Sequence, residues 1–143
     1  MIPHSKITGY AITAMSCLEG PDGQPVSGEY VAGRTKISRS YLANIIQALV
    51  RKDLVKTKPG YRGGLLLART PEEITLQEVV VAIEGPEWIG KCLLGLEGCD
   101  GNCPTHAFWK EEKSRIESEL RSRKLIEITN LKYTARNLSK MAG

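Results

Sequence analysis

Four side chains that commonly bind metals are concentrated in one short stretch of the sequence. Cys92, Cys99, Cys103 and His106 lie within fifteen residues, with six residues between the first two cysteines and three between the next two. The whole chain has four cysteines, so this density favours a dedicated site. Three thiolates and an imidazole suit an iron-sulfur cluster, in which the imidazole raises the reduction potential. They also suit a structural zinc ion.

The same residues allow other interpretations. The six-residue gap between Cys92 and Cys99 is wider than the knuckles typical of structural zinc, which favours a cluster over zinc. A disulfide or a reactive-thiol switch, with His106 packing under Trp109, is a further alternative. The cysteine pattern does not distinguish a 2Fe-2S cluster from a 4Fe-4S cluster.

The residues between the cysteines predict a loop that folds back on itself. Gly95, Gly98 and Gly101 permit backbone conformations that other residues avoid. Pro104 suits the first turn of a helix, so we expect a helix with Cys103 at its cap and the histidine one turn in. The loop would then converge its ligands at the start of that helix.

Length and composition indicate a single domain. The chain has 143 residues, of which 41% are hydrophobic, and this is enough for one core. No apolar run is long enough to cross a membrane, and the N-terminus has no signal-peptide core, so we expect a cytoplasmic protein without membrane contact. In that reducing compartment, cysteines favour metal or redox chemistry over structural disulfides.

The charge is distributed unevenly along the chain. Residues 1–70 contain ten Lys or Arg and four Asp or Glu, whereas residues 71–103 contain one Lys and seven acids. Residues 104–143 are basic again, although the net charge of the whole chain is only +4. A basic N-terminal half is the expected footprint of a nucleic-acid-binding module, although a solvated basic face would look the same.

A first amphipathic helix is predicted over residues 5–18. Its apolar stripe consists of Ile7, Tyr10, Ala11, Ala14, Cys17 and Leu18, which recur at helical spacing. Because Cys17 lies on this stripe, we interpret it as a small buried core residue.

Two capped segments in the basic half predict a helix-turn-helix. Ser27 can cap a short helix that ends near Thr35, and Ser38 can cap a second helix that reaches Lys52. A second helix with a polar, outward-facing start is typical of the helix that enters the major groove of DNA. The residues that we predict to contact DNA here are Ser38, Arg39, Ser40, Tyr41 and Asn44. An ordinary helical hairpin is the alternative.

The next segment predicts a basic β-hairpin. Residues 54–58 and 65–68 resemble strands, and they flank a glycine-rich turn at residues 59–64. A hairpin after the second helix is the wing of a winged helix. We therefore expect Lys56, Lys58 and Arg62 to contact phosphates or the minor groove, although a plain surface hairpin would share the pattern.

Two more helices flank the cysteine stretch. Thr75 and Glu78 form a capping box that opens a helix ending at Gly85. Residues 104–123 form a long helix whose narrow apolar stripe suits a seam between two subunits. The residues of this predicted homodimer seam are Trp109, Ile116 and Leu120; the alternative is a helix docked on its own domain. Residues 125–138 predict a weak further helix.

In this order, the elements resemble the Rrf-two family of bacterial transcription regulators along nearly the whole chain. The matching motifs are GYAITAM at residues 9–15, ISRSYLANI at 37–45, GLLLAR at 64–69, EEIT at 72–75 and CPTHAFW at 103–109. The last motif is the most specific. The likeness is strongest to the iron-sulfur cluster regulators within this family.

The resemblance implies a homodimeric repressor that binds a palindromic promoter site in double-stranded DNA. It also implies that Cys92, Cys99, Cys103 and His106 are the ligands of a 2Fe-2S cluster. The gap between Cys99 and Cys103 is shorter than the usual one in the family, which keeps a 4Fe-4S cluster among the alternatives.

We therefore predict a mainly α protein with a small β wing and three regions. These are a winged helix-turn-helix DNA-binding region at residues 1–85, a cysteine-rich loop at 86–103, and a dimerisation helix with its tail at 104–143. The predicted function is regulation of transcription under control of the cluster, which would sense redox state, iron or cluster status. No enzyme chemistry fits the pattern. The alternative is an iron-sulfur or zinc protein that acts as a scaffold or carries electrons without binding specific DNA.

Overall fold

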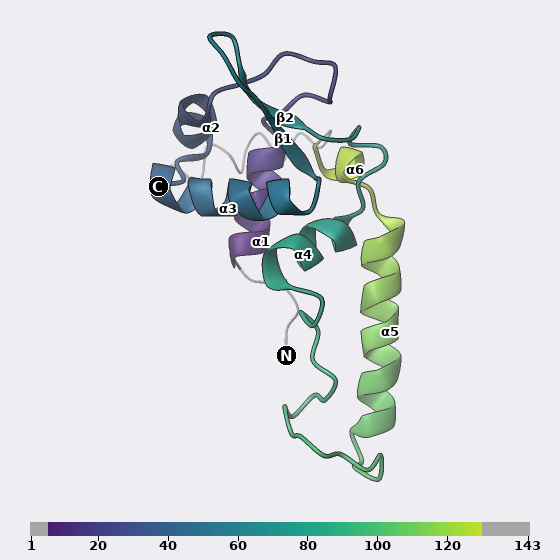
Figure 1. The fold of residues 1–143 in the computed structure, drawn as a ribbon. Helices are drawn as coiled ribbons and strands as arrows, with labels where there is room; N and C mark the ends of the chain where they lie inside the picture. The colour runs from purple at the N-terminus through teal and green to yellow at the C-terminus, as the bar shows by residue number, and fades with distance from the viewer. Residues whose placement is uncertain (1–5, 130–143) are drawn as a thin grey trace.

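The computed structural model describes residues 6–129, and this part of the chain is mainly helical with one small antiparallel sheet (Figure 1). Within these residues no helix is both long enough and apolar enough to cross a bilayer. The elements, in chain order, are α1 (Lys6–Met15), α2 (Gly28–Thr35), α3 (Arg39–Arg51), β1 (Val55–Lys58), β2 (Gly64–Leu67), α4 (Leu76–Glu84), α5 (His106–Ser122) and α6 (Leu125–Thr129). The predicted fold class is confirmed.

Side-chain caps define the starts of three helices. The Ser27 hydroxyl accepts a hydrogen bond from the Tyr30 amide at the start of α2. The Ser38 hydroxyl accepts one from the Tyr41 amide at the start of α3. Thr75 and Glu78 form the predicted capping box of α4. These caps satisfy amide groups that would otherwise lack partners, and their positions agree with those predicted from the sequence.

The hydrophobic core lies where α1, α3 and α4 meet beneath the sheet. Helix α4 packs against α1, α3 and α5, and α3 also packs against β1. Met15, Leu49, Leu67 and Val79 are fully or almost fully buried in this core, one from each of four elements. We call this packed unit the winged body.

The stripe predicted for α1 is only partly buried. Ala11, Ala14 and Leu18 are buried, whereas Cys17 is half-buried and Ile7 is exposed. Ile7 lies in the first turn of α1, at the end of the stripe. Burial raises the pKa of the Cys17 thiol, although the nearby Arg34 charge partly opposes this. Cys17 is therefore a core-edge residue with little thiolate character.

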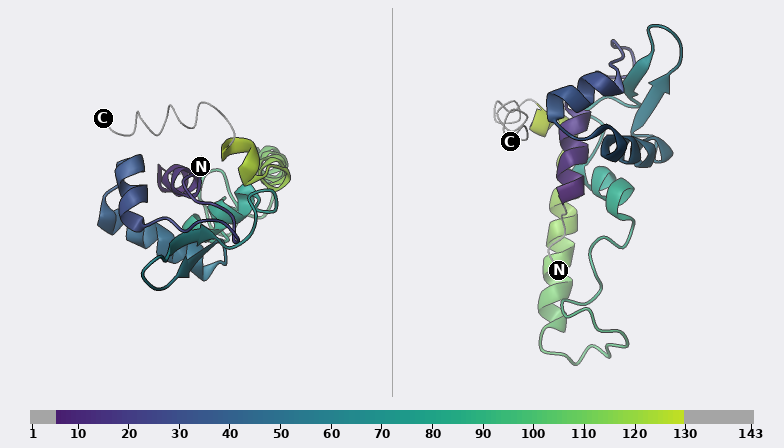
Figure 2. Two further views of the ribbon diagram at one scale, coloured as in Figure 1. Left: turned by 90° about the horizontal axis from the view of Figure 1, so that it is seen from above. Right: turned by 90° about the vertical axis from the view of Figure 1, so that its left-hand side faces the viewer.

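Helix α5 projects away from the winged body like an arm (Figures 1 and 2). The segment between α4 and α5 runs to the far end of this arm, and the chain then returns along α5 to the body. The hairpin of β1 and β2 protrudes at the opposite end of the molecule. We call residues 86–105 the cysteine loop.

The end of α5 is attached to the body by backbone hydrogen bonds. The Leu76 amide donates to the Arg123 carbonyl at 3.0 Å, and the Leu125 amide donates to the Ile74 carbonyl at 2.8 Å. Leu125 itself is fully buried in the core of the body. Of the helix predicted at residues 125–138, α6 accounts for Leu125–Thr129, and the rest lies outside the described residues.

Helix α5 begins two residues later than predicted. Its N-cap position is occupied by Thr105, whose side chain makes no capping bond, and His106 is the first helical residue. Pro104 lies in a turn instead, in which the His106 amide donates to the Cys103 carbonyl at 3.0 Å. The expectation of Cys103 at the cap was therefore wrong, because this turn precedes the helix.

Candidate cysteine site and nucleic-acid interface

The turn between α2 and α3 is held by a buried hydroxyl. Thr35 is fully buried, and its Oγ1 donates to the Val31 carbonyl at 2.7 Å and accepts from the Ile37 amide at 3.3 Å. Lys36 between them adopts a left-handed conformation with φ of 62°. This fixed turn sets the angle at which α3 leaves α2, as a helix-turn-helix requires.

The side chains predicted to contact bases form one exposed surface at the start of α3. Ser38, Arg39, Ser40, Tyr41 and Asn44 are all exposed. An open hollow of about 440 Å³ borders this surface; Arg39 and Ser40 line it from α3, Gly28 from α2 and Leu65 from β2. The structure therefore places these five residues together, next to the hairpin.

Two of these side chains have partners that the sequence did not indicate. The Arg39 guanidinium forms an ion pair with Glu29 of α2, with Nη1 and Oε1 2.9 Å apart. The Tyr41 ring stacks edge to face on Tyr10 of α1, with ring centroids 5.8 Å apart. Neither contact has a local sequence signal, because each joins two different helices.

The hairpin has the geometry of a wing. β1 pairs with β2 in antiparallel register, with Val55 opposite Leu67 and Lys58 opposite Gly64. Gly63 is required in the turn, because a Cβ atom there would lie 1.8 Å from the Lys58 carbonyl oxygen. The strands therefore close tightly and project a narrow tip.

The cations predicted on the wing are all exposed. Lys56 and Lys58 lie on β1, and Arg62 lies in the turn. Tyr61 beside Arg62 is completely exposed, and no pattern in the sequence marks it as a contact residue. The structure therefore adds an exposed aromatic ring to the cations at the tip of the wing.

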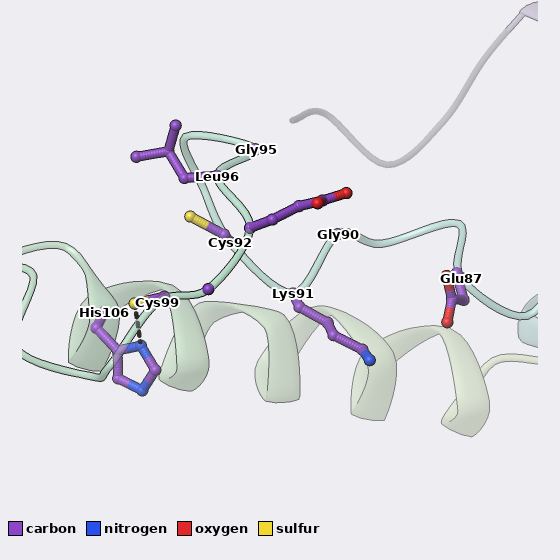
Figure 3. Close-up of a pocket in the computed structure, with 10 residues that line it drawn as sticks. Glu87, Gly90, Lys91, Cys92, Gly95, Leu96, Cys99 and His106 are labelled. Atoms are coloured by element: carbon purple, nitrogen blue, oxygen red, sulfur yellow. Dashed lines mark hydrogen bonds between the residues drawn. The ribbon is translucent and has the colours of Figure 1, made fainter.

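At the opposite end of the molecule, three of the four predicted ligands line one hollow (Figure 3). This hollow has a volume of about 580 Å³ and is lined by Cys92, Cys99 and His106. The Cys99 Sγ lies 3.6 Å from Nδ1 of His106 and accepts a hydrogen bond from the Gly101 amide at 3.4 Å. Donors from the two ends of the candidate segment are thus brought to one place.

The loop wraps around this hollow through glycines in left-handed conformations. Gly95, Gly98 and Gly101 have φ angles of 71°, 72° and 87°, a region that residues with a side chain rarely adopt. The glycine role predicted from the sequence is therefore confirmed. Asp100 contributes a local turn, in which its Oδ1 accepts from the Asn102 amide at 2.9 Å.

Two of the loop thiols have lowered pKa values. The Leu96 and Leu94 amides lower the pKa of Cys92, and the Thr105 hydroxyl and amide lower the pKa of Cys103. The Cys103 Sγ lies 3.2 Å from the Thr105 Oγ1. A lowered pKa favours the thiolate, which is the form that binds metals and reacts as a nucleophile.

The donors are gathered but do not form a closed coordination sphere. Among residues 6–129, no group of three or more Cys, His, Asp or Glu side chains lies close enough to hold a metal ion. Cys103 lies outside the lining of the hollow that contains the other three candidates. The donor set itself, with three thiols, one imidazole and two lowered pKa values, fits iron or zinc chemistry.

The residues predicted for a dimer seam differ in their surroundings. Trp109 is only 6% exposed, and its indole Nε1 donates to the Gly90 carbonyl at 2.7 Å. It therefore packs inside its own chain, whereas Ile116 and Leu120 are half-buried on α5.

Comparisons with known proteins agree with this architecture. The chain is 37% identical over 125 residues to the HTH-type transcriptional regulator IscR of Photorhabdus laumondii, covering 85% of this chain and 75% of the relative. The structure of IscR from T. potens superposes with a TM-score of 0.70 at 30% identity, covering 87% of this chain and 84% of that one. The structure of CymR, the global cysteine regulator of B. subtilis, gives a TM-score of 0.75 at 25% identity, covering 90% and 97%.

The Photorhabdus laumondii relative is a transcriptional regulator, which is not an enzymatic role, and the winged helix described above is a DNA-binding fold. The protein is accordingly a DNA-binding transcription regulator. The family model described as iron-dependent transcriptional regulator, Rrf2, matches residues 4–131, and the chain belongs to this family.

Proposed function

We propose that this regulator binds promoter DNA as a homodimer in the cytoplasm, and that an iron-sulfur cluster held by the cysteine loop controls this binding. The observation that carries the proposal is the spatial separation of the two sites. The start of α3 and the wing, which we propose to face DNA, belong to the winged body, whereas the cysteine loop runs to the far end of the arm (Figure 1). A ligand in the cysteine loop would therefore act through the fold, without contact to DNA.

The proposed ligands are Cys92, Cys99, Cys103 and His106. When bound, a cluster would supply a redox-active group whose loss or oxidation changes the local structure. The lowered thiol pKa values of Cys92 and Cys103 support thiolate ligation. Because Cys103 lies outside the shared hollow, ligation would require the loop to close around the bound group. This closure of the cysteine loop would be the structural change by which the bound cluster is sensed.

The proposed path from loop to DNA follows the connected elements. The cysteine loop joins α4 to α5, and α4 packs against both α1 and α3 of the winged body. The other end of α5 is fixed to the body by the bonds at Arg123 and Leu125. Closing the loop would therefore change the angle of the arm relative to the reading helix α3.

In a dimer paired through α5, with Ile116 and Leu120 at the seam, this angle would set the distance between two α3 helices. That distance must match half-sites about one helical turn of DNA, roughly 34 Å, apart. Coupling between two sites typically changes affinity by about 5- to 150-fold. The same range is expected between the cluster-bound and cluster-free dimers.

On the DNA side, we propose that Ser40, Tyr41 and Asn44 read base edges together with Ser38 and Arg39. Lys56, Lys58 and Arg62 of the wing would contact the phosphate backbone or the minor groove. The basic charge of residues 1–70, which contain ten cations and four acids, supports DNA contact by this half of the chain. Base contacts would provide specificity, whereas the wing would provide salt-dependent affinity.

The test combines two measurements on anaerobically purified protein. Iron and acid-labile sulfide are quantified beside the visible absorbance spectrum, and one promoter fragment is titrated with cluster-bound and cluster-free dimer at equal salt. The expected result is a coloured protein whose two forms differ in affinity. A colourless protein with one zinc per chain would contradict the cluster, and equal affinities across several promoters would contradict the sensor role.

The variant His106→Cys distinguishes an iron-sulfur cluster from a zinc ion through the reduction potential. A thiolate donates more charge to iron than a neutral imidazole does, so the variant should keep a cluster with a lower reduction potential. The potential is measured by redox titration of the visible absorbance. An unchanged potential would remove His106 from the ligand set.

A further inference from the structure

The ring of Trp109 faces the interior of its own chain, at the base of the cysteine loop. The side chain is 6% exposed, and its Nε1 donates to the Gly90 carbonyl oxygen at 2.7 Å. Phe108, the preceding residue on α5, is 56% exposed. Two neighbouring aromatic residues on α5 therefore have opposite surroundings, and the one with a hydrogen-bond donor is the buried one.

The partners of this bond lie at the two ends of the ligand segment. Gly90 comes two residues before Cys92, and Trp109 comes three residues after His106. The indole bond consequently closes a loop that contains all four candidate ligands. Ile89, beside Gly90, is also buried at 3% exposure, so the chain is packed immediately before the residues that carry the candidate ligands.

Beyond this attachment the loop is open to solvent. Residues 94–102 are all exposed, with Leu96 at 62%. An exposed segment rich in glycine has a large conformational freedom to lose when it must bring ligands together. An attachment at its base reduces that freedom before any group binds, which is preorganisation in the usual sense.

We propose that Trp109 is a positioning residue for the cysteine loop: its indole N–H holds the Gly90 carbonyl and thereby keeps Cys92 near Cys99 and His106. The ligand assignment in this inference rests on the proposed function. The attachment itself does not, because it is a property of the chain without a cofactor. It also replaces the predicted role of Trp109 in the subunit seam.

The first test uses the metal-free chain. Trp109→Phe keeps an aromatic ring but removes the donor, and the loss of one neutral hydrogen bond typically changes an equilibrium by roughly two- to tenfold. Hydrogen exchange of the amides at residues 90–94 should accelerate by this factor, while exchange in α3 stays unchanged. The matched control is Trp88→Phe, the same substitution at the half-buried tryptophan just after α4, which should leave exchange at residues 90–94 close to that of the wild type.

The second test uses the cluster-loaded protein. Loss of visible absorbance to an iron chelator should be roughly two- to tenfold faster in Trp109→Phe than in wild type and in Trp88→Phe. If the wild type holds no iron or sulfide, the proposed function fails, and the exchange measurement still decides whether Trp109 holds the loop. Wild-type exchange in Trp109→Phe would overturn the inference.

Two further outcomes are decisive. If Trp109→Phe does not fold, replacement of Trp109 by benzothienylalanine, which keeps the ring shape and lacks the N–H, provides the same comparison with less change in packing. If either variant weakens dimerisation, measured by sedimentation, without changing exchange at residues 90–94, the seam interpretation is restored and the positioning role is overturned.

Discussion

The pKa of the cysteine thiols is shifted in opposite directions in the winged body and in the cysteine loop. Cys17 at the edge of the body has a raised pKa, and the cause is burial. Cys92 and Cys103 in the loop have lowered pKa values, and the causes are hydrogen-bond donors beside the sulfur atoms. The same side chain is thus a small, largely apolar group in one region and a thiol shifted towards its thiolate form in the other.

The two regions differ in packing as well as in chemistry. The body has caps on three helices and a core that draws on its helices and on the wing. The loop is mostly exposed, and its shape depends on three left-handed glycines and the bond from Trp109. The shape of the body is therefore fixed by its core, whereas few contacts fix the shape of the loop.

The largest expected effect would remove the cofactor and leave the body intact. Cys103→Ala eliminates one proposed thiolate, and the variant should lose iron and sulfide completely, because each thiolate is needed to retain the cluster. Its helical content by circular dichroism should equal that of the wild type, since Cys103 lies outside the core. Cys17→Ala is the matched control and should keep its full metal content. Retained iron in Cys103→Ala would remove this residue from the ligand set.

The winged body and the cysteine loop should also differ in how much a leucine side chain contributes to the free energy of unfolding. Leu49 of α3 is fully buried in the body, whereas Leu96 of the loop is 62% exposed. Leu49→Ala should lower the free energy of unfolding by about 2–5 kcal/mol through lost burial and a cavity. Leu96→Ala should change it by less than about 0.5 kcal/mol. Urea unfolding of the metal-free chains measures both, and similar losses would show that the loop is part of the core.

This difference in packing also explains what could be predicted from the sequence. The helix-turn-helix, the wing and the capping box depend on local signals, namely Ser27 and Ser38 as caps, the glycine-rich turn, and Thr75 with Glu78. Local signals determine local structure, so these elements were predicted within one or two residues. The role of the glycines in folding back the cysteine loop was predicted for the same reason.

Contacts between distant segments could not be predicted in this way. The Arg39 to Glu29 ion pair, the Tyr41 to Tyr10 stacking and the Trp109 to Gly90 bond each depend on how two segments meet in space. Trp109 illustrates the problem, because its spacing with Ile116 and Leu120 indicates one helix face but not what covers it. The start of α5 was predicted two residues too early because Pro104 can occupy either the first turn of a helix or the turn that precedes it.

A third prediction uses pH to test the junction between wing and α4. Partial burial raises the pKa of Glu78, but hydrogen bonds from the Thr75 amide and the Arg69 guanidinium outweigh this and hold the pKa below its ordinary value. A carboxyl with a lowered pKa in the folded state stabilises the fold above its unfolded pKa. This contribution is lost as the pH falls through the folded pKa.

Glu78→Gln should therefore be less stable than wild type at neutral pH, and the difference should shrink in acid. Urea unfolding at pH 7 and near pH 3 measures this, with Glu97→Gln in the exposed loop as the matched control that should show no such difference. A gap that stays constant with pH would mean that Glu78 acts through packing and not through its charge.

The smallest expected effect concerns single exposed cations at the two ends of the molecule. Arg62 in the wing turn and Lys91 in the cysteine loop are both exposed, so the folded chain should tolerate Arg62→Ala and Lys91→Ala equally well. If Arg62 contacts a phosphate, its removal should weaken cognate and unrelated DNA similarly and reduce the slope of log affinity against log salt by about one unit.

Lys91→Ala should leave that slope unchanged, because this cation lines the hollow of the cysteine loop, away from the wing. Affinity is measured over a series of salt concentrations on both DNA sequences. A loss confined to the cognate sequence would mean that Arg62 reads a base or a groove width, so that the wing contributes to specificity. An equal change in slope for Lys91→Ala would place the cysteine loop against DNA. The cysteine loop and the winged body would then no longer have separate roles.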